Sequence, residues 1–421
     1  MKKLKTIGVI TAIILAWTAF VGMGFINGYL LRPINSDGTA AGFIEACKGR
    51  LEKEFVGNLA IALIEDGEVN QTFFYGHADQ TIDKHSAFPV ASVSKWVTAV
   101  GVLKLVESGQ LDLDKPVEDY LTRWHLPESE YDNNEVTVRR LLSHSAGFDD
   151  DLGYNGFAAN EKLQTLEESL NKAADAGSWT EGKARVGQKP GDQYMYSGAS
   201  YTLLQLLIEE VSQMPFEAYM EQQLFEPLGM TNSSFSLSDS TAIGLVDVYK
   251  TDTTTRPMKR FTAKAAASLM TSTADLSKFM IALMPPQGTT ILSAEMIEEM
   301  RSPQSYRNGH AYYGLGPSLY GHPLGKSRTF GHDGSGNDAI NAAARMDFDN
   351  NAGIIILETG NYAYASEMAD EWLFWQAGIA DRVVMQRNIP FLLTILGFGY
   401  LLIIAIAIWF LRKGSRIKKS H

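Results

Sequence analysis

The chain of 421 residues contains a single cysteine, Cys47, and this shortage excludes two structural features. One cysteine cannot close an intramolecular disulfide, and it cannot build a metal site from several thiolates. The sequence also lacks a His-Glu-x-x-His motif, which disfavours a zinc hydrolase, so we expect no metal and no other cofactor. Cys47 is therefore expected to be a small buried apolar residue rather than a nucleophile.

Acidic residues are absent from both ends of the chain. Residues 1–32 carry four lysines and arginines without an acid, and residues 387–421 carry six. Removing these ten cations from the net charge of −11 leaves −21 on residues 33–386. A body this acidic repels phosphate backbones, so nucleic-acid binding is excluded as a function.

The same two ends contain long runs without charge. The run within residues 1–31 and the run 389–411 each have the roughly 20 residues that cross a bilayer as a helix. Basic residues lie before the first run and in the tail 412–421, so the positive-inside rule places both termini in the cytoplasm. We expect an extracytoplasmic body anchored in a bacterial cell membrane. A cleaved signal peptide is the open alternative for residues 1–31.

The apolar fraction of 45% excludes a disordered body, because it is enough to build a core. After a linker at residues 32–40, one domain is expected over residues 41–380. Strands are predicted at Leu59–Ile64 and Thr72–Tyr75, and again at Ala339–Met346 and Gly353–Leu357. A charged helix is predicted over Glu161–Ala176, a helix at Glu367–Gln376, and a capping box at Ser272 and Asp275 before a further helix.

Strands therefore come early and late in the body, with helices between them. The fold class this order predicts is α+β, with one antiparallel sheet built from both ends of the body. The helical subdomain is expected at about residues 113–247. Terminal transmembrane helices complete the predicted architecture.

Ser92-Val93-Ser94-Lys95 places a hydroxyl and an amine three residues apart at the predicted start of a helix. This spacing brings both groups onto one face. Serine becomes a nucleophile when a base removes its proton, and a desolvated lysine is such a base. The helix start also supplies N–H groups for a developing oxyanion. The plain alternative is a helix cap beside a surface lysine.

The Ser-x-x-Lys pattern alone is weak, because the chain contains it three times. Ser169–Lys172 lies in the predicted charged helix, and Ser415–Lys418 lies in the basic tail. Only the copy at Ser92 follows a pair of predicted strands and begins an apolar helix with Trp96, Val97, Val100 and Leu103 on one stripe.

Five segments, in this order, resemble the motifs of the serine β-lactamase and penicillin-binding protein superfamily. The resemblance is greatest to the branch of class C β-lactamases, D-Ala-D-Ala carboxypeptidases and related esterases, and extends from about Ala41 to Gly378. The five segments are Phe88–Lys95, Leu111–Val117, Leu141–Gly147, Pro190–Tyr201 and Phe330–Gly334.

The resemblance implies a role for each matching residue. Ser92 would be acylated, and Lys95 and Tyr196 would share the acid–base work. The N–H groups of Ser92 and Ser335 would form the oxyanion hole, with Ser335 following His332-Asp333-Gly334 on an edge strand. His332 and Gly334 would also line the substrate site. His144 is expected to hold a loop by hydrogen bonds.

Two departures from the superfamily's motifs bear on substrate. Gly198 stands where the family has an asparagine that contacts the substrate's amide side chain, and His332 stands where it often has lysine. A permanent cation for a substrate carboxylate is therefore missing at neutral pH. Both changes favour a broader amidase or esterase over strict D-Ala-D-Ala trimming or efficient β-lactam hydrolysis.

The sequence thus predicts an extracytoplasmic serine hydrolase whose partners are the membrane and a small-molecule or peptide substrate. That substrate is expected to be a peptidoglycan stem peptide, a β-lactam or an ester. A non-catalytic sensor on the penicillin-recognising fold is the first alternative. The second is a peptidase that trims an exported N-acyl-D-amino-acid precursor. The sequence does not indicate an oligomeric state.

Overall fold

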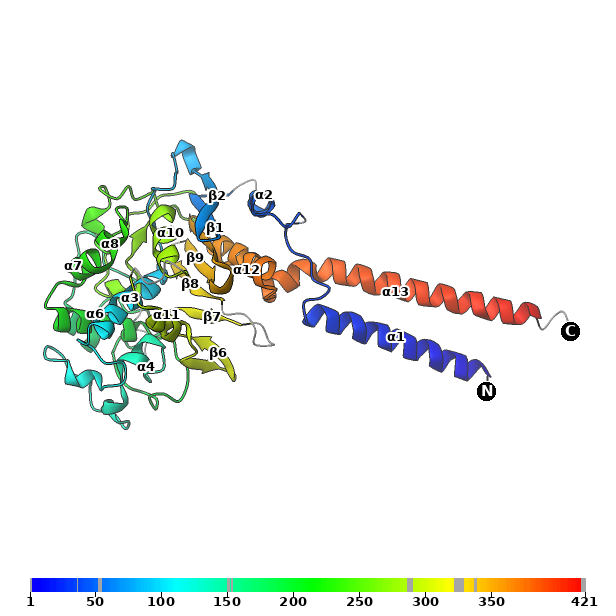
Figure 1. Ribbon diagram of the computed structural model, residues 1–421, viewed down its shortest axis with the longest axis horizontal. Coiled ribbons are helices and arrows are strands. Elements are labelled where there is room, and N and C mark those ends of the chain that lie inside the picture. The colour runs from blue at the N-terminus through cyan, green and yellow to red at the C-terminus, as the bar shows by residue number, and fades with distance from the viewer. Residues whose placement is uncertain are drawn as a thin grey trace. The chain divides into compact units, whose positions relative to one another are not determined.

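The computed structural model describes residues 2–35, 37–51, 55–149, 152, 154–285, 291–321, 329–336 and 339–417. They form two compact units. One unit combines the chain ends, residues 1–38 and 370–421, and the other contains residues 39–369. All the strands labelled in Figure 1 belong to the larger unit, which also contains the candidate site.

The core of the larger unit is an antiparallel sheet of eight strands in the order β2-β1-β10-β9-β8-β7-β6-β5. Two strands come from the start of the unit and six from its end, which confirms the predicted α+β fold with one sheet drawn from both ends. The strands are β1 Leu59–Glu65, β2 Glu68–Tyr75, β5 Ser305–Arg307, β6 His310–Tyr313, β7 Ser318–Tyr320, β8 Thr329–Gly336, β9 Ile340–Asp347 and β10 Ala352–Thr359.

The central strands are apolar on both faces because helices cover both faces of the sheet. Every residue of β10 is buried, and Ile356 lies opposite Ile61 of β1. The strands predicted at Leu59–Ile64 and Thr72–Tyr75 are confirmed and pair as the hairpin of β1 and β2, with Asp66 and Gly67 at its tip in the left-handed region (φ +53° and +76°) that such tight turns require.

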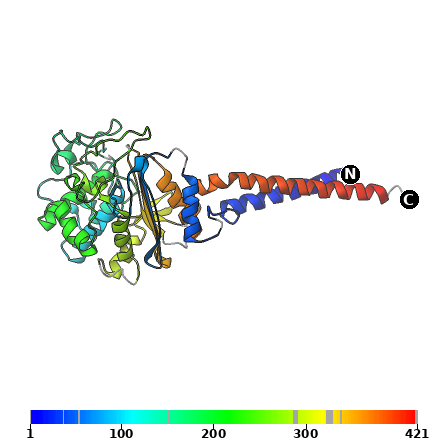
Figure 2. The ribbon, with the colours of Figure 1, turned by 90° about the horizontal axis from the view of Figure 1, so that it is seen from above.

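Helices and loops fill the chain between β2 and β5, and Figure 2 shows them gathered on one side of the sheet. Half of the predicted capping box is present at the start of α10, where the Ser272 side chain accepts a hydrogen bond from Asp275 N (3.2 Å), while the Asp275 carboxylate accepts from Asn232 N (2.6 Å). The short strands β3 Phe88–Pro89 and β4 Met270–Thr271 form a separate pair. The helices of this unit are α2 Ala40–Arg50, α3 Val93–Glu107, α4 Val138–Leu142, α5 Leu166–Asn171, α6 Gly198–Ser212, α7 Phe216–Met220, α8 Glu226–Leu228, α9 Lys264–Ala267, α10 Thr273–Ala282 and α11 Ala294–Arg301, with α12 Tyr364–Ala377 beginning here.

The prediction of one long helix over Glu161–Ala176 is wrong, because α5 covers only Leu166–Asn171. Thr165 and Glu168 form a capping box that starts the helix, which the charge pattern alone did not reveal. At the other end Lys172 is extended (φ −165°), so the chain leaves the helix after less than two turns.

Helix α3 runs through the middle of the larger unit. All four residues of its predicted stripe are fully buried, and so are most of its other residues. The Trp96 ring makes edge-to-face contacts with Phe279 (5.1 Å between centroids) and with Phe330 of β8 (5.8 Å). These contacts fix the helix that begins at Ser92 against the sheet.

The unit of the chain ends consists largely of two helices, α1 Lys2–Ile26 and α13 Arg382–Ile417. They lie side by side in both views, and the Thr18 hydroxyl is 2.7 Å from the Tyr400 hydroxyl. Thr6–Ile26 and Arg382–Arg412 have mean hydropathies of 2.2 and 2.7, so each is long and apolar enough to cross a membrane.

Candidate active site

Ser92 and Lys95 face each other at the start of α3. The Ser92 hydroxyl makes no capping hydrogen bond and instead accepts one from Lys95 Nζ (3.1 Å). Lys95 is only 1% exposed, and its Nζ also donates to the Ala266 carbonyl (2.8 Å). A helix cap beside a surface lysine is therefore not what this pair of residues forms.

The loop that delivers Ser92 is held on both sides. Ala91 has a left-handed backbone (φ +43°), which is unusual for a residue with a side chain. Its carbonyl accepts a hydrogen bond from the Ser94 hydroxyl (2.5 Å), and the same hydroxyl accepts from Leu269 N (2.9 Å). The Ser92 backbone is thus fixed before any substrate binds.

Tyr196 lies over the amine of Lys95, with its ring centroid 4.9 Å from Nζ. The rings of Tyr201 and Tyr154 are 5.7 and 5.9 Å from the same nitrogen. Three aromatic rings thus surround an amine that is almost fully buried. The structure therefore brings Ser92, Lys95 and Tyr196 together, while their chemical roles stay a prediction.

His144 holds the backbone on both sides of Tyr196. Its carbonyl accepts from Met195 N (2.7 Å), its Nδ1 accepts from Ser197 N (3.1 Å), and its ring is 4.3 Å from the Tyr196 ring between centroids. His144 is fully buried, and burial holds its pKa well below the ordinary value. The expectation that His144 holds a loop by hydrogen bonds is confirmed.

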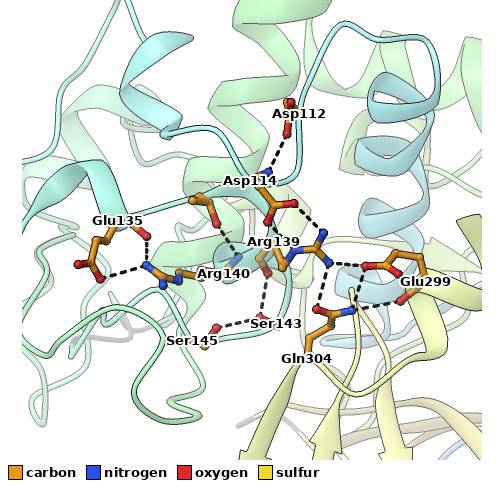
Figure 3. Close-up of polar contacts among 10 residues, drawn as sticks. Asp112, Asp114, Glu135, Arg139, Arg140, Ser143, Ser145, Glu299 and Gln304 are labelled. Atoms are coloured by element: carbon orange, nitrogen blue, oxygen red, sulfur yellow. Dashed lines mark hydrogen bonds and ion pairs between the residues drawn. The ribbon is translucent and has the colours of Figure 1, made fainter.

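The segment that carries His144 is anchored through Arg139 of α4 (Figure 3). The Arg139 guanidinium donates to both carboxylate oxygens of Asp114 (2.7 and 2.9 Å), to Glu299 and to Gln304 (3.1 Å). The hydrogen bond to Arg139 lowers the pKa of the Asp114 carboxyl. The Arg139 side chain thus links three segments that are far apart in the sequence.

Strand β8 forms the opposite side of the site. Its pairing with β7 ends at Gly331, so the residues after Gly331 have no strand on that edge among the described residues. A β-carbon at Gly334 would overlap the Val90 carbonyl oxygen and lie 3.2 Å from Ser92 N. Glycine at 334 is therefore needed for β8 to approach the backbone of Ser92 this closely.

Asn341 of β9 orients the peptide between Gly334 and Ser335. Its Nδ2 donates to the Gly334 carbonyl (3.1 Å) and to Ser366 Oγ (3.0 Å), and its Oδ1 accepts from Ser366 N (3.0 Å). A trans peptide directs its carbonyl and its N–H to opposite sides. Because the carbonyl is bound by β9, the Ser335 N–H is directed away from β9, toward the open edge.

His332 is buried in the strand with both ring nitrogens engaged. Nδ1 lies 2.6 Å from the Asp333 carbonyl and so carries the proton, while Nε2 lies 2.7 Å from the Tyr313 hydroxyl and accepts from it. Burial, together with the charge of Lys95, lowers the pKa of His332 to about 4. The ring is therefore neutral at neutral pH, and its contact with a substrate stays a prediction.

A cavity of about 240 Å³ lies beside Ser92. No acidic side chain occurs among its described lining residues, whereas Arg256 and Lys259 join Lys95 there. Most of the other lining side chains are apolar or aromatic. The lining residues are Pro89, Ala91, Ser92, Lys95, Tyr154, Trp179, Tyr196, Arg256, Met258, Lys259, Phe261, Ala267, Ser335, Gly336 and Ile340.

Three residues of this site were missed by reasoning from the sequence: Tyr154, Tyr313 and Asn341. Asn341 had a usable signal, since it is an amide between the apolar residues Ile340 and Ala342 of a predicted strand. Tyr154 and Tyr313 had none, because aromatic residues are common in cores. Within the described ranges, no three His, Cys, Asp or Glu side chains gather as metal ligands.

Comparison with solved structures supports the same fold. The octameric penicillin-binding protein homologue from Pyrococcus abyssi superposes with a TM-score of 0.67 at 26% identity, covering 84% of this chain and 80% of the other. The D-amino acid amidase from Ochrobactrum anthropi superposes with a TM-score of 0.62, covering 79% and 98%. At 22% identity the amidase shows a shared fold only.

Comparison of sequences gives the family. The protein flp of Staphylococcus aureus is 26% identical over 273 residues, which are 62% of this chain and 52% of flp, so the match spans about half of that relative. A beta-lactamase of Yersinia enterocolitica is 26% identical over 294 residues, which are 68% of this chain and 70% of that protein. The beta-lactamase family model matches residues 47–378, and the chain belongs to this family of serine β-lactamase and penicillin-binding-protein-like hydrolases.

Proposed function

We propose that this protein is a membrane-anchored serine hydrolase that forms an acyl-enzyme at Ser92. The observation that carries the proposal is the 3.1 Å contact between Lys95 Nζ and the Ser92 hydroxyl, made by a lysine that is 1% exposed. The lysine nitrogen lies within hydrogen-bond distance of the hydroxyl, so Lys95 is placed to take the Ser92 proton as the serine attacks.

In the first half of the reaction, Lys95 or Tyr196 removes the Ser92 proton, and Ser92 Oγ bonds to the substrate carbonyl carbon. The N–H groups of Ser92 and Ser335 stabilise the negative oxygen. The bond to the leaving nitrogen or oxygen then breaks, and that atom takes up the proton. In the second half, water attacks the acyl-enzyme, releasing a carboxylic acid and restoring the Ser92 hydroxyl.

A labelling experiment with a fluorophosphonate tests the nucleophile. The wild type should be labelled, and Ser92→Ala should not. The chain offers a matched control, because Ser169 begins a second Ser-x-x-Lys sequence at Ser169–Lys172. Ser169→Ala should be labelled like the wild type. Equal labelling of Ser92→Ala and the wild type would refute the proposal.

The substrates are proposed to be esters or amides at the cell wall, handled by an esterase, an amidase or a D-alanyl-D-alanine carboxypeptidase. The neutral, fully engaged His332 and the missing amide at Gly198 favour the first two, because neither residue offers the expected contact to a D-Ala-D-Ala peptide. Acetate release from p-nitrophenyl acetate should exceed D-alanine release from diacetyl-Lys-D-Ala-D-Ala. The opposite order would identify a carboxypeptidase.

A non-catalytic sensor is the second candidate, favoured by the glycine at position 198. A sensor would be acylated once and would stop, whereas a hydrolase releases many equivalents of p-nitrophenol per protein. Release of only one equivalent of p-nitrophenol per protein would refute the hydrolase and support the sensor.

Helices α1 and α13 are proposed to anchor the body outside the cytoplasm, with both termini inside, which the basic residues at both ends support. A fluorescent protein fused to the C-terminus should then fluoresce in cells. Cysteine introduced at the exposed Thr251 should react with a membrane-impermeant maleimide, over a low background because Cys47 is fully buried. Protection of this cysteine in intact cells would reverse the proposed orientation.

A further inference from the structure

The space in which a side chain at position 198 would lie is filled by another residue, Tyr154. Gly198 is buried at the first position of α6, and a β-carbon there would overlap the hydroxyl and the ring of Tyr154. The two residues are 44 positions apart in the sequence, yet the tyrosine occupies the space into which a side chain at 198 would extend. Glycine at 198 and tyrosine at 154 are thus complementary in size.

Tyr154 is held in this position by its own segment. Asn155 N donates to the Asp175 carbonyl (2.9 Å), and the Asn155 carbonyl accepts from Lys259 Nζ (2.6 Å). Two residues later Phe157 exchanges both backbone hydrogen bonds with Arg260 (2.8 and 2.9 Å). The backbone that follows Tyr154 is therefore held by hydrogen bonds to two other segments of the chain.

The ring of Tyr154 lines the cavity beside Ser92 and lies 5.9 Å from Lys95 Nζ, while its hydroxyl oxygen is buried against α6. The cavity therefore meets an aromatic surface at this point. Trp179, Met258 and Ile340 add aromatic and aliphatic surface to the same cavity, which also holds the cations Lys95, Arg256 and Lys259. An acyl group placed against the aromatic and aliphatic side chains would contact mainly carbon.

We propose that Tyr154 is a specificity-determining residue, which makes the cavity select acyl groups without an amide next to the reacting carbonyl. This inference rests on the proposed acylation of Ser92. An amide pressed against the face of the tyrosine ring would lose a hydrogen bond to water without gaining one from that ring, while an apolar chain gains by leaving water. Discrimination of about tenfold or more is expected from such a difference.

Two esters of nearly the same shape test this selection in the full-length chain. They are the p-nitrophenyl esters of 4-methylpentanoic acid and of N-acetylglycine, which differ in one amide group. After correction for spontaneous hydrolysis, the wild type should favour the 4-methylpentanoate by about tenfold in kcat/KM. A preference for the N-acetylglycine ester would overturn the proposal without any variant.

Exchange of the two residues tests which side chain is responsible. Tyr154→Ala with Gly198→Asn should shift the ratio of kcat/KM toward the N-acetylglycine ester by about tenfold. Gly198→Asn alone should lower activity on both esters, since its side chain meets Tyr154. Tyr306→Ala, at a tyrosine that is 55% exposed, is the control and should leave the ratio unchanged. An unchanged ratio in the double variant would overturn the proposal.

Two further measurements distinguish failure of the proposed selection from failure of the proposed hydrolase function. Should the double variant fold poorly, inhibition of the wild type by 3-methylbutylboronic and acetamidomethylboronic acids gives the same comparison, and stronger inhibition by the second would overturn the selection. Fluorophosphonate labelling of the wild type reports on Ser92 separately. If the wild type is labelled but shows no preference between the esters, only the proposed selection by Tyr154 is refuted. If the wild type is neither labelled nor active, the proposed hydrolase function is refuted as well.

Discussion

The two sides of the cavity beside Ser92 are held in different ways. The strand wall, residues 332–336 of β8, is backed by β9, where Asn341 and Arg345 are 1% and 2% exposed. Arg345 binds the Asp333 carboxylate through two nitrogens (2.6 and 2.9 Å). The loop wall, formed by Tyr154, Trp179 and residues 256–261, includes an indole that is 67% exposed.

The difference indicates a division of work. Groups that stabilise a transition state must keep their geometry, and a strand with buried partners provides this. Groups that fit one acyl chain rather than another sit on loops, where side chains are exchanged at small cost to the fold. Changes in the strand wall should therefore alter kcat, and changes in the loop wall should alter the choice of substrate.

Lys95→Met should have the largest effect, because it removes the proposed base and keeps nearly the length of the side chain. Fluorophosphonate labelling and ester hydrolysis should fall about 10³-fold. Lys172→Met, in the matching sequence at Ser169–Lys172, is the control and should retain full activity. A loss of less than tenfold would assign the proton transfer elsewhere.

Asn341→Ala should have the next largest effect and would test the strand wall. Without the hydrogen bond to the Gly334 carbonyl, the Ser335 N–H is less firmly directed, so kcat should fall about 10–100-fold while KM changes little. The matched control is Ser366→Ala, which removes the other partner of the same amide nitrogen. Equal losses in both variants would show that Asn341 acts only through packing.

Glu358→Gln, in β10 behind the strand wall, should change how the free energy of unfolding depends on pH. Glu358 lies opposite Asn341 in the sheet, and burial raises its pKa to about 8. The folded chain thus keeps a proton that the unfolded chain has already released, so stability falls as pH rises toward 8. Between pH 6.5 and 8 the wild type should lose about 2 kcal/mol of unfolding free energy.

Urea unfolding at the two pH values would measure this loss. The glutamine variant keeps an acceptor for the Ala365 N–H and cannot ionise, so its stability should be nearly constant over the same interval. An alkaline loss as large in Glu358→Gln as in the wild type would locate the titrating group elsewhere.

Trp179→Ala should have the smallest effect and would test the loop wall. An indole that is 67% exposed contributes part of one face to the bound acyl group, so KM for apolar esters should rise about threefold, with kcat unchanged. Steady-state kinetics with p-nitrophenyl butyrate would measure both constants. A fall in kcat with constant KM would contradict the division of work between the walls.

Much of the strand wall could be predicted from the sequence. The pattern around Ser92 and the strands at both ends of the body fixed the sheet and the helix that meets it, because local periodicity and turn residues report on regular structure. Two of the three Ser-x-x-Lys sequences lie wholly within the described residues, and their context separated them correctly. The copy at Ser92 has its lysine buried against the serine, whereas Lys172 of the second copy is exposed.

The loop wall could not be predicted, because it depends on contacts between distant segments. The residues near Gly198 in the sequence do not indicate that Tyr154 occupies the space beside it. The two residues meet only when α6 packs against the loop that contains Tyr154. The failure at Glu161–Ala176 has a local origin instead. Charge spacing suggested a long helix, whereas a capping box at Thr165 starts α5 late and the extended Lys172 ends it early.

The left-handed backbone at Ala91 has a consequence for engineering heat tolerance. Glycine would relieve roughly 1 kcal/mol of steric cost at this φ angle, yet it would give back a similar amount as extra freedom of the unfolded chain. The exchange is close to neutral for melting temperature, while it loosens the turn that presents Ser92. Thermostabilised descendants of this chain should therefore keep alanine at position 91 and accumulate their substitutions elsewhere.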